Sequence, residues 1–271
     1  MSPLLELQGV SYTYPSTPHP AIQNLTLSIL AGKKTVILGH NGCGKSTLLL
    51  LADGLFPIHT GTIYWKGEPL RYHPSILNLW RQRIGLTFQD PEQQLIAATV
   101  AEDISYGLFN LSLPKTEVAL RLHQVLIDFS LQDLADRPLH QLSLGQKRRV
   151  ALAGVIARRP ELVLLDEPTA YLDRWQTHHL FKELERIHAN GTTLVMATHD
   201  IDLAYAWADW VVVLHEGQLM VSQPALQVFS QLEVLKQLRL GIPLILEYWN
   251  SLPDEWRKNH LPPRWFDRFS I

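Results

Sequence analysis

Long hydrophobic runs are missing from this sequence, and cysteine nearly so. No apolar stretch approaches the roughly 18 residues that a membrane-spanning helix needs, so work at a membrane would require other chains to span it. Glu6 interrupts the first apolar residues and no positive segment precedes them, so we expect no signal peptide. Cys43 is the only cysteine, which excludes an intramolecular disulfide and fits a reducing compartment.

An excess of positive charge is also missing. The 24 Lys and Arg residues are balanced by 26 Asp and Glu residues, so the chain has no overall field for nucleic acid and we expect no nucleic-acid partner. Hydrophobic residues make up 46% and charged residues 18% of the 271 positions, values that are typical of a globular protein of one large domain or two modest ones. The twelve histidines are scattered without the spacing of a metal-ligand set.

Two kinds of strand are predicted. In LTLSI (25–29) the apolar residues alternate with Thr26 and Ser28, and GTIYWKGEP (61–69) is typical of a strand closed by a turn, so the first 70 residues are expected to hold a small antiparallel β layer. Other apolar runs lack alternation, which is typical of strands buried on both faces of a parallel sheet. These runs are TVILG (35–39), LVLLD (162–166), TLVMAT (193–198) and WVVVL (210–214).

Helical stretches separate the unalternating strands. One helix is expected over 174–190, because Asp173 can serve as its N-cap and Gly191 as the residue that ends it. Alternation of strand and helix predicts an α/β core.

Residues 99–155 interrupt this alternation and are predicted to be helical. Thr99 and Glu102 form a capping-box pattern, and Pro114 suits the first turn of a second helix. We interpret the region as a helical insertion in the α/β core, and residues 224–271 as a C-terminal extension that is helical at first.

The segment GHNGCGKS (39–46) fits the phosphate-loop pattern G-x-x-x-x-G-K-[ST] between a predicted strand and an apolar helix. Its glycines let backbone amides approach phosphate oxygens, and the helix directs its positive end at the same oxygens. Lys45 is expected to reach the β- and γ-phosphates, and the Ser46 hydroxyl to bind magnesium. The predicted nucleotide-binding residues are Gly39, His40, Asn41, Gly42, Cys43, Gly44, Lys45, Ser46 and Thr47.

Acids and a histidine follow two of the predicted parallel strands. LVLLDEP (162–168) ends in Asp166, expected to hold magnesium, and Glu167, expected to act as general base or to orient the attacking water. His199 follows TLVMAT and is expected to contact the γ-phosphate. The carboxyl ends of such strands form the ligand crevice of a parallel sheet, which predicts a catalytic site there.

The stretch LSLGQKRRVALAG (142–154) opens another helix, whose polar side we expect to carry Lys147, Arg148 and Arg149. Ser143 and Gly145 at its start would present a hydroxyl and backbone amides to a second anion. One nucleotide cannot easily use two such helix starts of one chain, so a two-fold dimer is expected in which each chain caps the nucleotide of the other.

Together these motifs resemble the nucleotide-binding subunit of ATP-binding cassette (ABC) transporters over about residues 4–222. The likeness implies a P-loop NTPase (RecA-like) α/β core with an antiparallel β subdomain and a helical subdomain over about 93–155, in an ATPase domain spanning 1–223. It implies ATP and Mg²⁺ as ligands. It assigns Tyr14, with Tyr12 as the alternative, to stacking on adenine. Gln89 is similar to the Gln-loop residue that touches magnesium and the attacking water.

The likeness extends to two motifs at the expected dimer interface. The signature reads LSLGQ, with Leu144 where glycine is commonest, while Ser143, Gly145 and Gln146 remain as phosphate contacts. Asp173 in TAYLD is similar to the D-loop aspartate. Both half-sites look usable, so a homodimer is the simpler expectation and a heterodimer with a related chain the alternative.

A finer resemblance concerns residues 87–107, which are similar to the Gln loop of the energy-coupling-factor group, importers of cobalt, nickel, biotin and other vitamins. Residues 223–243 are similar to the tail that follows the ATPase core in that group. The likeness implies an integral membrane coupling subunit, a substrate-binding membrane subunit and a position at the cytoplasmic face of the cell membrane. Cobalt or nickel is the first expectation for the cargo and a vitamin the second.

Other interpretations stay open. A soluble ABC ATPase of DNA repair or translation lacks support, because the chain has neither a long coiled-coil insertion nor a second cassette. A non-catalytic scaffold is disfavoured by Glu167 and His199, and an exporter by the absence of a fused membrane domain. The aromatic residues of the C-terminal extension are expected to pack on their own domain or to contact a partner; they are Trp249, Trp256, Trp265, Phe266 and Phe269.

Overall fold

A computed structural model describes residues 2–15, 17–253 and 257 of the chain. Two compact units make up the structure. Unit 1 comprises Met1–Ala52, Phe56–Pro69 and Val195–Ile271, and unit 2 comprises Asp53–Leu55 and Leu70–Leu194. Trp256, Trp265, Phe266 and Phe269 lie outside the described residues.

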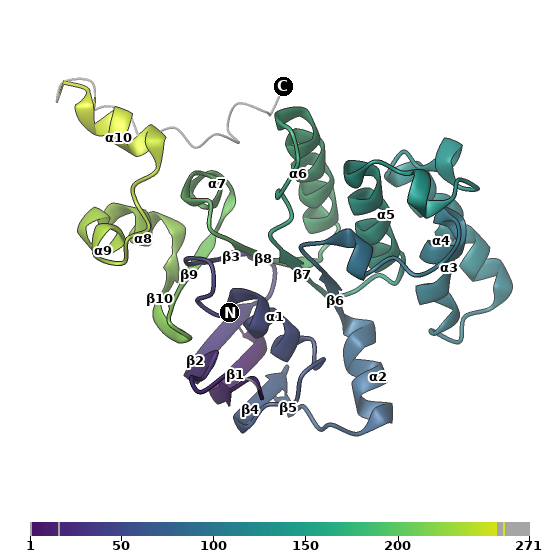
Figure 1. Ribbon diagram of the computed structural model, residues 1–271, viewed down its shortest axis with the longest axis horizontal. Coiled ribbons are helices and arrows are strands. Elements are labelled where there is room, and N and C mark those ends of the chain that lie inside the picture. Colours follow the sequence, from purple (N-terminus) through teal and green to yellow (C-terminus); the bar gives the residue numbers. More distant parts are fainter. Residues whose placement is uncertain (1, 16, 254–256, 258–271) are drawn as a thin grey trace. The chain divides into compact units, whose positions relative to one another are not determined.

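Unit 1 contains the small β layer that the first 70 residues predict. Its antiparallel strands follow the order β2-β1-β4-β5, where β1 is Pro3–Tyr12, β2 Ile22–Leu30, β4 Thr60–Trp65 and β5 Glu68–Pro69 (Figure 1). Leu25, Leu27 and Ile29 are buried while Thr26 and Ser28 are exposed. The prediction from alternation is therefore confirmed, because one face of β2 covers apolar residues and the other meets solvent.

A second set of strands in unit 1 has the order β10-β9-β3-β8. These are β3 (Lys34–Leu38), β8 (Thr193–Thr198, in this unit from Val195 on), β9 (Trp210–His215) and β10 (Gln218–Pro224). The β3 and β9 strands are parallel and their central residues are fully buried, as the unalternating runs predict. Helix α1 (Lys45–Ala52) follows β3, and helix α7 (Ile201–Trp207) follows β8. The phosphate loop and His199 therefore lie at the carboxyl ends of these two strands.

The C-terminal extension also packs within unit 1. It forms α8 (Ala225–Ser230), α9 (Leu232–Gln237) and α10 (Leu244–Ser251) (Figure 1). The Phe229 ring meets the Tyr205 ring of α7 edge to face, with centroids 5.1 Å apart. Two polar contacts add to this packing: the Leu244 amide donates to Asp202 Oδ1 at 2.7 Å, and His40 Nε2 lies 3.2 Å from the Leu238 carbonyl oxygen.

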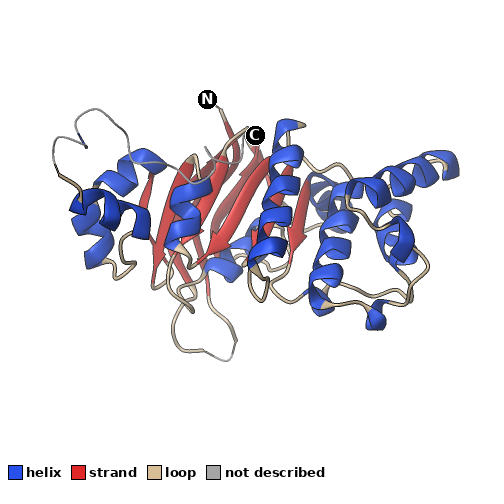
Figure 2. Cartoon of the chain, turned by 90° about the horizontal axis from the view of Figure 1, so that it is seen from above, coloured by secondary structure: helices blue, strands red, loops and turns tan. Residues whose placement is uncertain are grey.

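Unit 2 holds two neighbouring parallel strands and five helices, of which α3, α4 and α5 belong to the insertion. The strands are β6 (Ile84–Thr87) and β7 (Leu162–Asp166). The helices are α2 (Pro74–Arg83), α3 (Val100–Phe109), α4 (Lys115–Asp128), α5 (Leu144–Ala157) and α6 (Arg174–Ala189), with short 3₁₀ turns at Pro91–Gln93, Gln132–Leu134 and Leu139–Gln141. The insertion is helical as predicted, and its helices are among those drawn in blue in Figure 2.

Local capping explains where these helices begin. Reciprocal capping boxes start α3 (Thr99 with Glu102), α5 (Ser143 with Gln146) and α6 (Asp173 with Gln176). The N-terminal cap predicted for α6 is confirmed, and Gly191 follows the helix with φ +96°. The expectation for Pro114 needs a small correction: with ψ 145° it precedes α4 as N-cap, and the first helical residue is Lys115.

Candidate functional site

The phosphate loop of unit 1 is a tight turn that only glycine can make at two positions. A Cβ on Gly39 would lie 2.5 Å from the Leu214 carbonyl oxygen and would also overlap Cys43 Sγ. Gly44 has φ +105°, and a Cβ there would lie 2.5 Å from the Ala21 carbonyl oxygen. Side chains would block this turn, so the backbone itself forms the surface that can approach a ligand.

The polar side chains of the loop suit a nucleotide with its magnesium ion. Lys45 is 6% exposed, and its Nζ donates to the Gly39 carbonyl at 2.7 Å and the His40 carbonyl at 3.1 Å. Ser46 is exposed at the start of α1, where the positive helix end favours anions. The backbone amides and the ammonium group can donate hydrogen bonds to phosphate oxygens, and the hydroxyl oxygen can ligate Mg²⁺. These residues therefore fit both ligands.

The two candidate aromatics for adenine differ in accessibility. Tyr12 is 7% exposed because its ring stacks on Phe56 at 5.5 Å and contacts His59. Tyr14 is half-buried, and its hydroxyl lies 3.0 Å from Thr47 Oγ1. The enclosed position of Tyr12 favours Tyr14 for the stacking role.

His199 follows β8 in unit 1 and is exposed. The next residue caps α7: Asp200 Oδ1 accepts from the Leu203 amide at 2.9 Å, and the Asp200 amide donates to Thr198 Oγ1 at 3.1 Å. His199 therefore lies at the end of a strand, as the sequence predicts, and the capping by Asp200 fixes the backbone next to it.

In unit 2, Asp166 is the last residue of β7 and Glu167 follows it directly. Both are buried, at 7% and 6% exposed. Glu167 has φ +41°, in the left-handed region that non-glycine residues seldom occupy. A left-handed conformation at a non-glycine residue costs roughly 1–3 kcal/mol and needs surroundings that hold it in place.

Arg148 is a residue of this site that sequence reasoning missed. The polar side expected for α5 implies solvent around Arg148, but this prediction is wrong because the side chain is 7% exposed. Its Nη1 donates to the Glu167 carbonyl and its Nη2 to the Gln89 carbonyl, each at 2.9 Å. The structure thus brings the backbones of Gln89 and Glu167 together through one guanidinium, although the Gln89 residue is exposed.

The polar loop after β6 is braced rather than free. Gln94 Oε1 accepts from the Phe88 amide at 3.3 Å, and its Nε2 donates to the Ala151 carbonyl of α5 at 2.9 Å. Asp103 Oδ1 accepts from the amide of Ile96 at 2.8 Å. Residues 88–97 are therefore hydrogen-bonded to α3 and α5. The polar composition of the loop would by itself indicate side chains that point into solvent.

The signature residues lie at the start of α5. The Ser143 hydroxyl accepts from the Gln146 amide at 3.3 Å, and Gln146 Oε1 accepts from the Ser143 amide at 2.8 Å. The capping box uses the amides of Ser143 and Gln146, while the Ser143 hydroxyl accepts within it and keeps its own proton to donate. Leu144 is 37% exposed, and a cavity of about 380 Å³ lies between the starts of α5 and α6, lined by Ser143, Gly145 and Trp175 among others.

Asp173 also serves as a cap, because its Oδ1 accepts from the Gln176 amide at 2.7 Å.

Neither a cluster of three metal-ligating His, Cys, Asp or Glu side chains nor a helix long and apolar enough to cross a bilayer occurs within the described part of the chain.

The ABC transporter family model matches residues 22–170. The chain belongs to the ABC transporter family. The chain is 55% identical over 268 residues to an ABC transporter ATP-binding protein of Thermosynechococcus vestitus, covering 99% of this chain and 94% of that protein. The name of that protein specifies no cargo. It is 42% identical to the cobalt import ATP-binding protein CbiO of Rhodobacter capsulatus, covering 91% and 88%. It is 39% identical to an energy-coupling factor transporter ATP-binding protein of Carboxydothermus hydrogenoformans, covering 93% and 92%.

A solved structure agrees with this assignment. CbiO1 of Clostridium perfringens, described as part of the ABC transporter complex CbiONQ, superposes with a TM-score of 0.77 at 36% identity, covering 89% of this chain and 96% of that one. The resemblance to ABC ATPases of the energy-coupling-factor and cobalt group is confirmed, as is the P-loop NTPase fold. As a member of this family the chain is an ATPase that binds ATP with Mg²⁺.

Proposed function

We propose that this ABC ATPase energises an importer of the energy-coupling-factor type, with cobalt or nickel ions as cargo. The segment 87–107 carries the proposal, because its sequence is similar to the Gln loop of that group and it links Gln89 to a capped helix of the insertion. The relatives named for cobalt import and for energy coupling support the assignment. A vitamin is the second candidate cargo.

The residue roles follow from position and chemistry. Lys45 holds the transferring phosphoryl group, Ser46 and Asp166 hold Mg²⁺, and Tyr14 stacks on adenine. Mg²⁺ supplies neutralisation of the charge that develops on the phosphate oxygens. Glu167 accepts a proton from the attacking water, whose oxygen forms the new bond to phosphorus as the bond to the ADP oxygen breaks. Gln89 and His199 orient that water and the γ-phosphate.

A dimer completes each site in this proposal. Ser143, Gly145 and Gln146 of one chain face the nucleotide of the other, and the Asp173 residues lie across the interface. We expect a homodimer, with a heterodimer of related chains as the alternative. A membrane coupling subunit then docks at residues 90–107, so that the assembly works at the cytoplasmic face of the membrane.

The decisive enzymatic experiment uses Glu167→Gln, which keeps the size of the side chain and removes its basicity. Loss of one such group typically lowers turnover about 10²–10³-fold. We expect ATP binding by fluorescent-nucleotide titration to stay near that of the wild type, while phosphate release falls by this factor and closed dimers accumulate on gel filtration. Near-normal hydrolysis would show that the base is another residue.

The transport assignment needs a separate experiment. Tagged protein is purified from gently solubilised membranes, and the accompanying chains are identified by mass spectrometry. A multi-spanning coupling subunit together with a metal-binding or vitamin-binding membrane subunit supports the importer and identifies the cargo class. Recovery with ribosomes or DNA alone would instead support a soluble ABC ATPase.

A further inference from the structure

Arg148 is a buried charge with two specific partners. Arginine is seldom buried unless it is paired, and here the guanidinium forms one hydrogen bond to the Glu167 carbonyl and one to the Gln89 carbonyl. Burial lowers the pKa of Arg148, and the nearby Asp90 and Tyr171 oppose this lowering only in part. The side chain therefore lies among the Gln loop, the end of β7 and the segment before α6.

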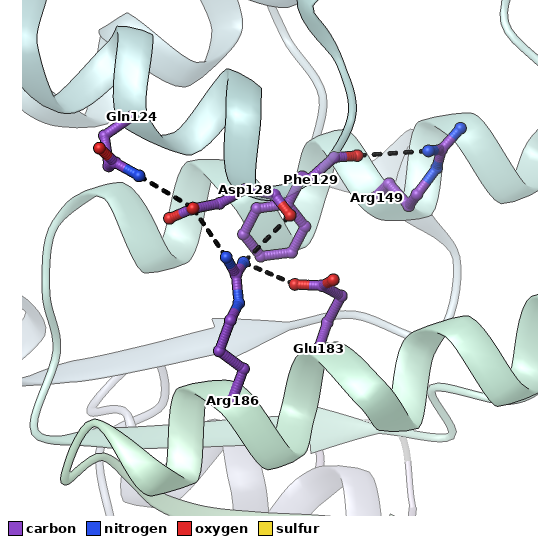
Figure 3. Close-up of polar contacts among 6 residues, drawn as sticks. All are labelled: Gln124, Asp128, Phe129, Arg149, Glu183 and Arg186. Atoms are coloured by element: carbon purple, nitrogen blue, oxygen red, sulfur yellow. Dashed lines mark hydrogen bonds and ion pairs between the residues drawn. The ribbon is translucent and has the colours of Figure 1, made fainter. Parts of the chain in front are cut away.

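The adjacent arginine serves a different element. Arg149 Nη1 donates to the Phe129 carbonyl at 3.2 Å, at the end of α4. Figure 3 shows this contact, with Arg186 bound at the same helix end to Asp128. Consecutive residues of a helix point about 100° apart, so the pair Arg148 and Arg149 sends one guanidinium to the catalytic segment and the other to α4.

The geometry of a guanidinium explains why arginine suits position 148. Its planar fork presents two donors at a fixed separation, whereas the lysine ammonium is a single point with rotatable donors. The two carbonyls that it binds belong to Gln89 and Glu167, whose proposed roles in hydrolysis require a fixed position relative to each other. One of them, Glu167, has the left-handed φ of +41° that needs support from its surroundings.

We propose that Arg148 is a positioning residue for ATP hydrolysis, which fixes the backbones of Gln89 and Glu167 relative to each other. The inference rests on the roles proposed above for these two residues. Because Arg148 lies on α5, the helix that begins at the signature residue Ser143, any shift of this helix acts on both catalytic backbones at once. The signature helix is thereby linked to the base and the water-orienting residue of its own chain.

The test compares Arg148→Lys with Arg158→Lys. Arg158 is a half-buried arginine that caps the C-terminal end of α5, and its Nη2 donates to the Ile84 carbonyl at 3.2 Å, at the start of β6 and away from Gln89. Both changes keep the charge and weaken one set of carbonyl contacts. Misplacement of catalytic groups by about 1 Å can cost 10²-fold, so we expect kcat of Arg148→Lys to fall about 10–100-fold while the Kd for ATP changes less than about twofold.

Arg158→Lys is expected to lose thermal stability without this loss of kcat. Equal losses of kcat in both variants, or no loss in Arg148→Lys, would overturn the inference. Arg148→Gln gives a second measurement if the lysine variant does not fold, with the same split expected between kcat and Kd. Glu167→Gln is measured in parallel: if it hydrolyses normally, the role proposed above for Glu167 fails, whereas a slow Glu167→Gln with a normal Arg148→Lys overturns only the role of Arg148.

Discussion

The hydroxyl oxygen of Tyr14 lies 3.0 Å from the hydroxyl oxygen of Thr47. Thr47 is 6% exposed in the first turn of α1, next to Ser46 of the phosphate loop. The aromatic side chain proposed for adenine is therefore tied to the helix that begins at the proposed phosphate contacts. Its ring position is set by this hydrogen bond and by edge-to-face contact with Tyr12, whose centroid is 5.1 Å away.

Two replacements of Tyr14 distinguish the contribution of its ring to ATP binding from that of its hydroxyl. Stacking of a base on an aromatic side chain contributes about 1–3 kcal/mol, so Tyr14→Ala should weaken ATP binding by about tenfold or more. Tyr14→Phe keeps the ring and loses the bond to Thr47, and we expect a loss of only about threefold. Fluorescent-nucleotide titration measures both; equal affinities for the alanine variant and the wild type would assign adenine to another residue.

Asp53 makes the stability of unit 2 depend on pH. Burial raises the pKa of this carboxyl to about 7, against the lowering effects of Arg81 and Arg158. The folded protein thus binds this proton more tightly than the unfolded chain does, so its stabilising effect is full below the ordinary carboxyl range and is lost as pH rises through about 4 to about 7. Asp53→Asn removes the titration, and the wild type should lose more unfolding free energy than this variant between about pH 5 and about pH 8.

Urea titration at these two pH values measures the difference. Glu117→Gln provides a control that should follow the wild type between these two pH values, because the hydrogen bond from Arg121 lowers the pKa of Glu117 and places its titration at more acidic pH. Its contribution is therefore present at neutral pH and lost as pH falls. Parallel pH profiles for the wild type and Asp53→Asn would contradict the assignment of this titration to Asp53.

Gln94 is expected to control opening of the loop after β6. Gln94→Ala removes the acceptor of the Phe88 amide and the donor to the Ala151 carbonyl. A hydrogen bond of this kind contributes about 1 kcal/mol, so amide exchange over 88–97 should quicken about fivefold. Gln93→Ala is the matched control, because the Gln93 side chain is exposed. Equal exchange in the two variants, measured by mass spectrometry, would show that Gln94 does not brace the loop.

The features that could be predicted from the sequence depend on neighbours along the chain. Alternation in β2, the capping box of Thr99 and Glu102, and the phosphate loop all arise within a few residues, so local chemistry specifies them. The fold and the family follow from several such motifs in order.

The contacts that could not be predicted join distant positions. Arg148 is 59 residues from Gln89 in sequence, and His40 is 198 residues from Leu238. Nothing local distinguishes Arg148 from Lys147 or Arg149, because the run KRR is charged throughout. Burial of one of these three depends on which side of α5 meets the rest of unit 2, and this needs the tertiary structure.

The contacts of the C-terminal extension bear on exchange of segments between related chains. The Leu238 carbonyl lies against His40 of the phosphate loop, and the Leu244 amide is bonded to Asp202 of α7. Grafting another extension after residue 224 would conserve these links only if the new backbone returned to both side chains. Conversely, a core lacking a donor at position 40 and a carboxylate at position 202 would receive this extension without its polar attachments. An exchange that keeps both contacts must therefore transfer His40 and Asp202 together with the extension.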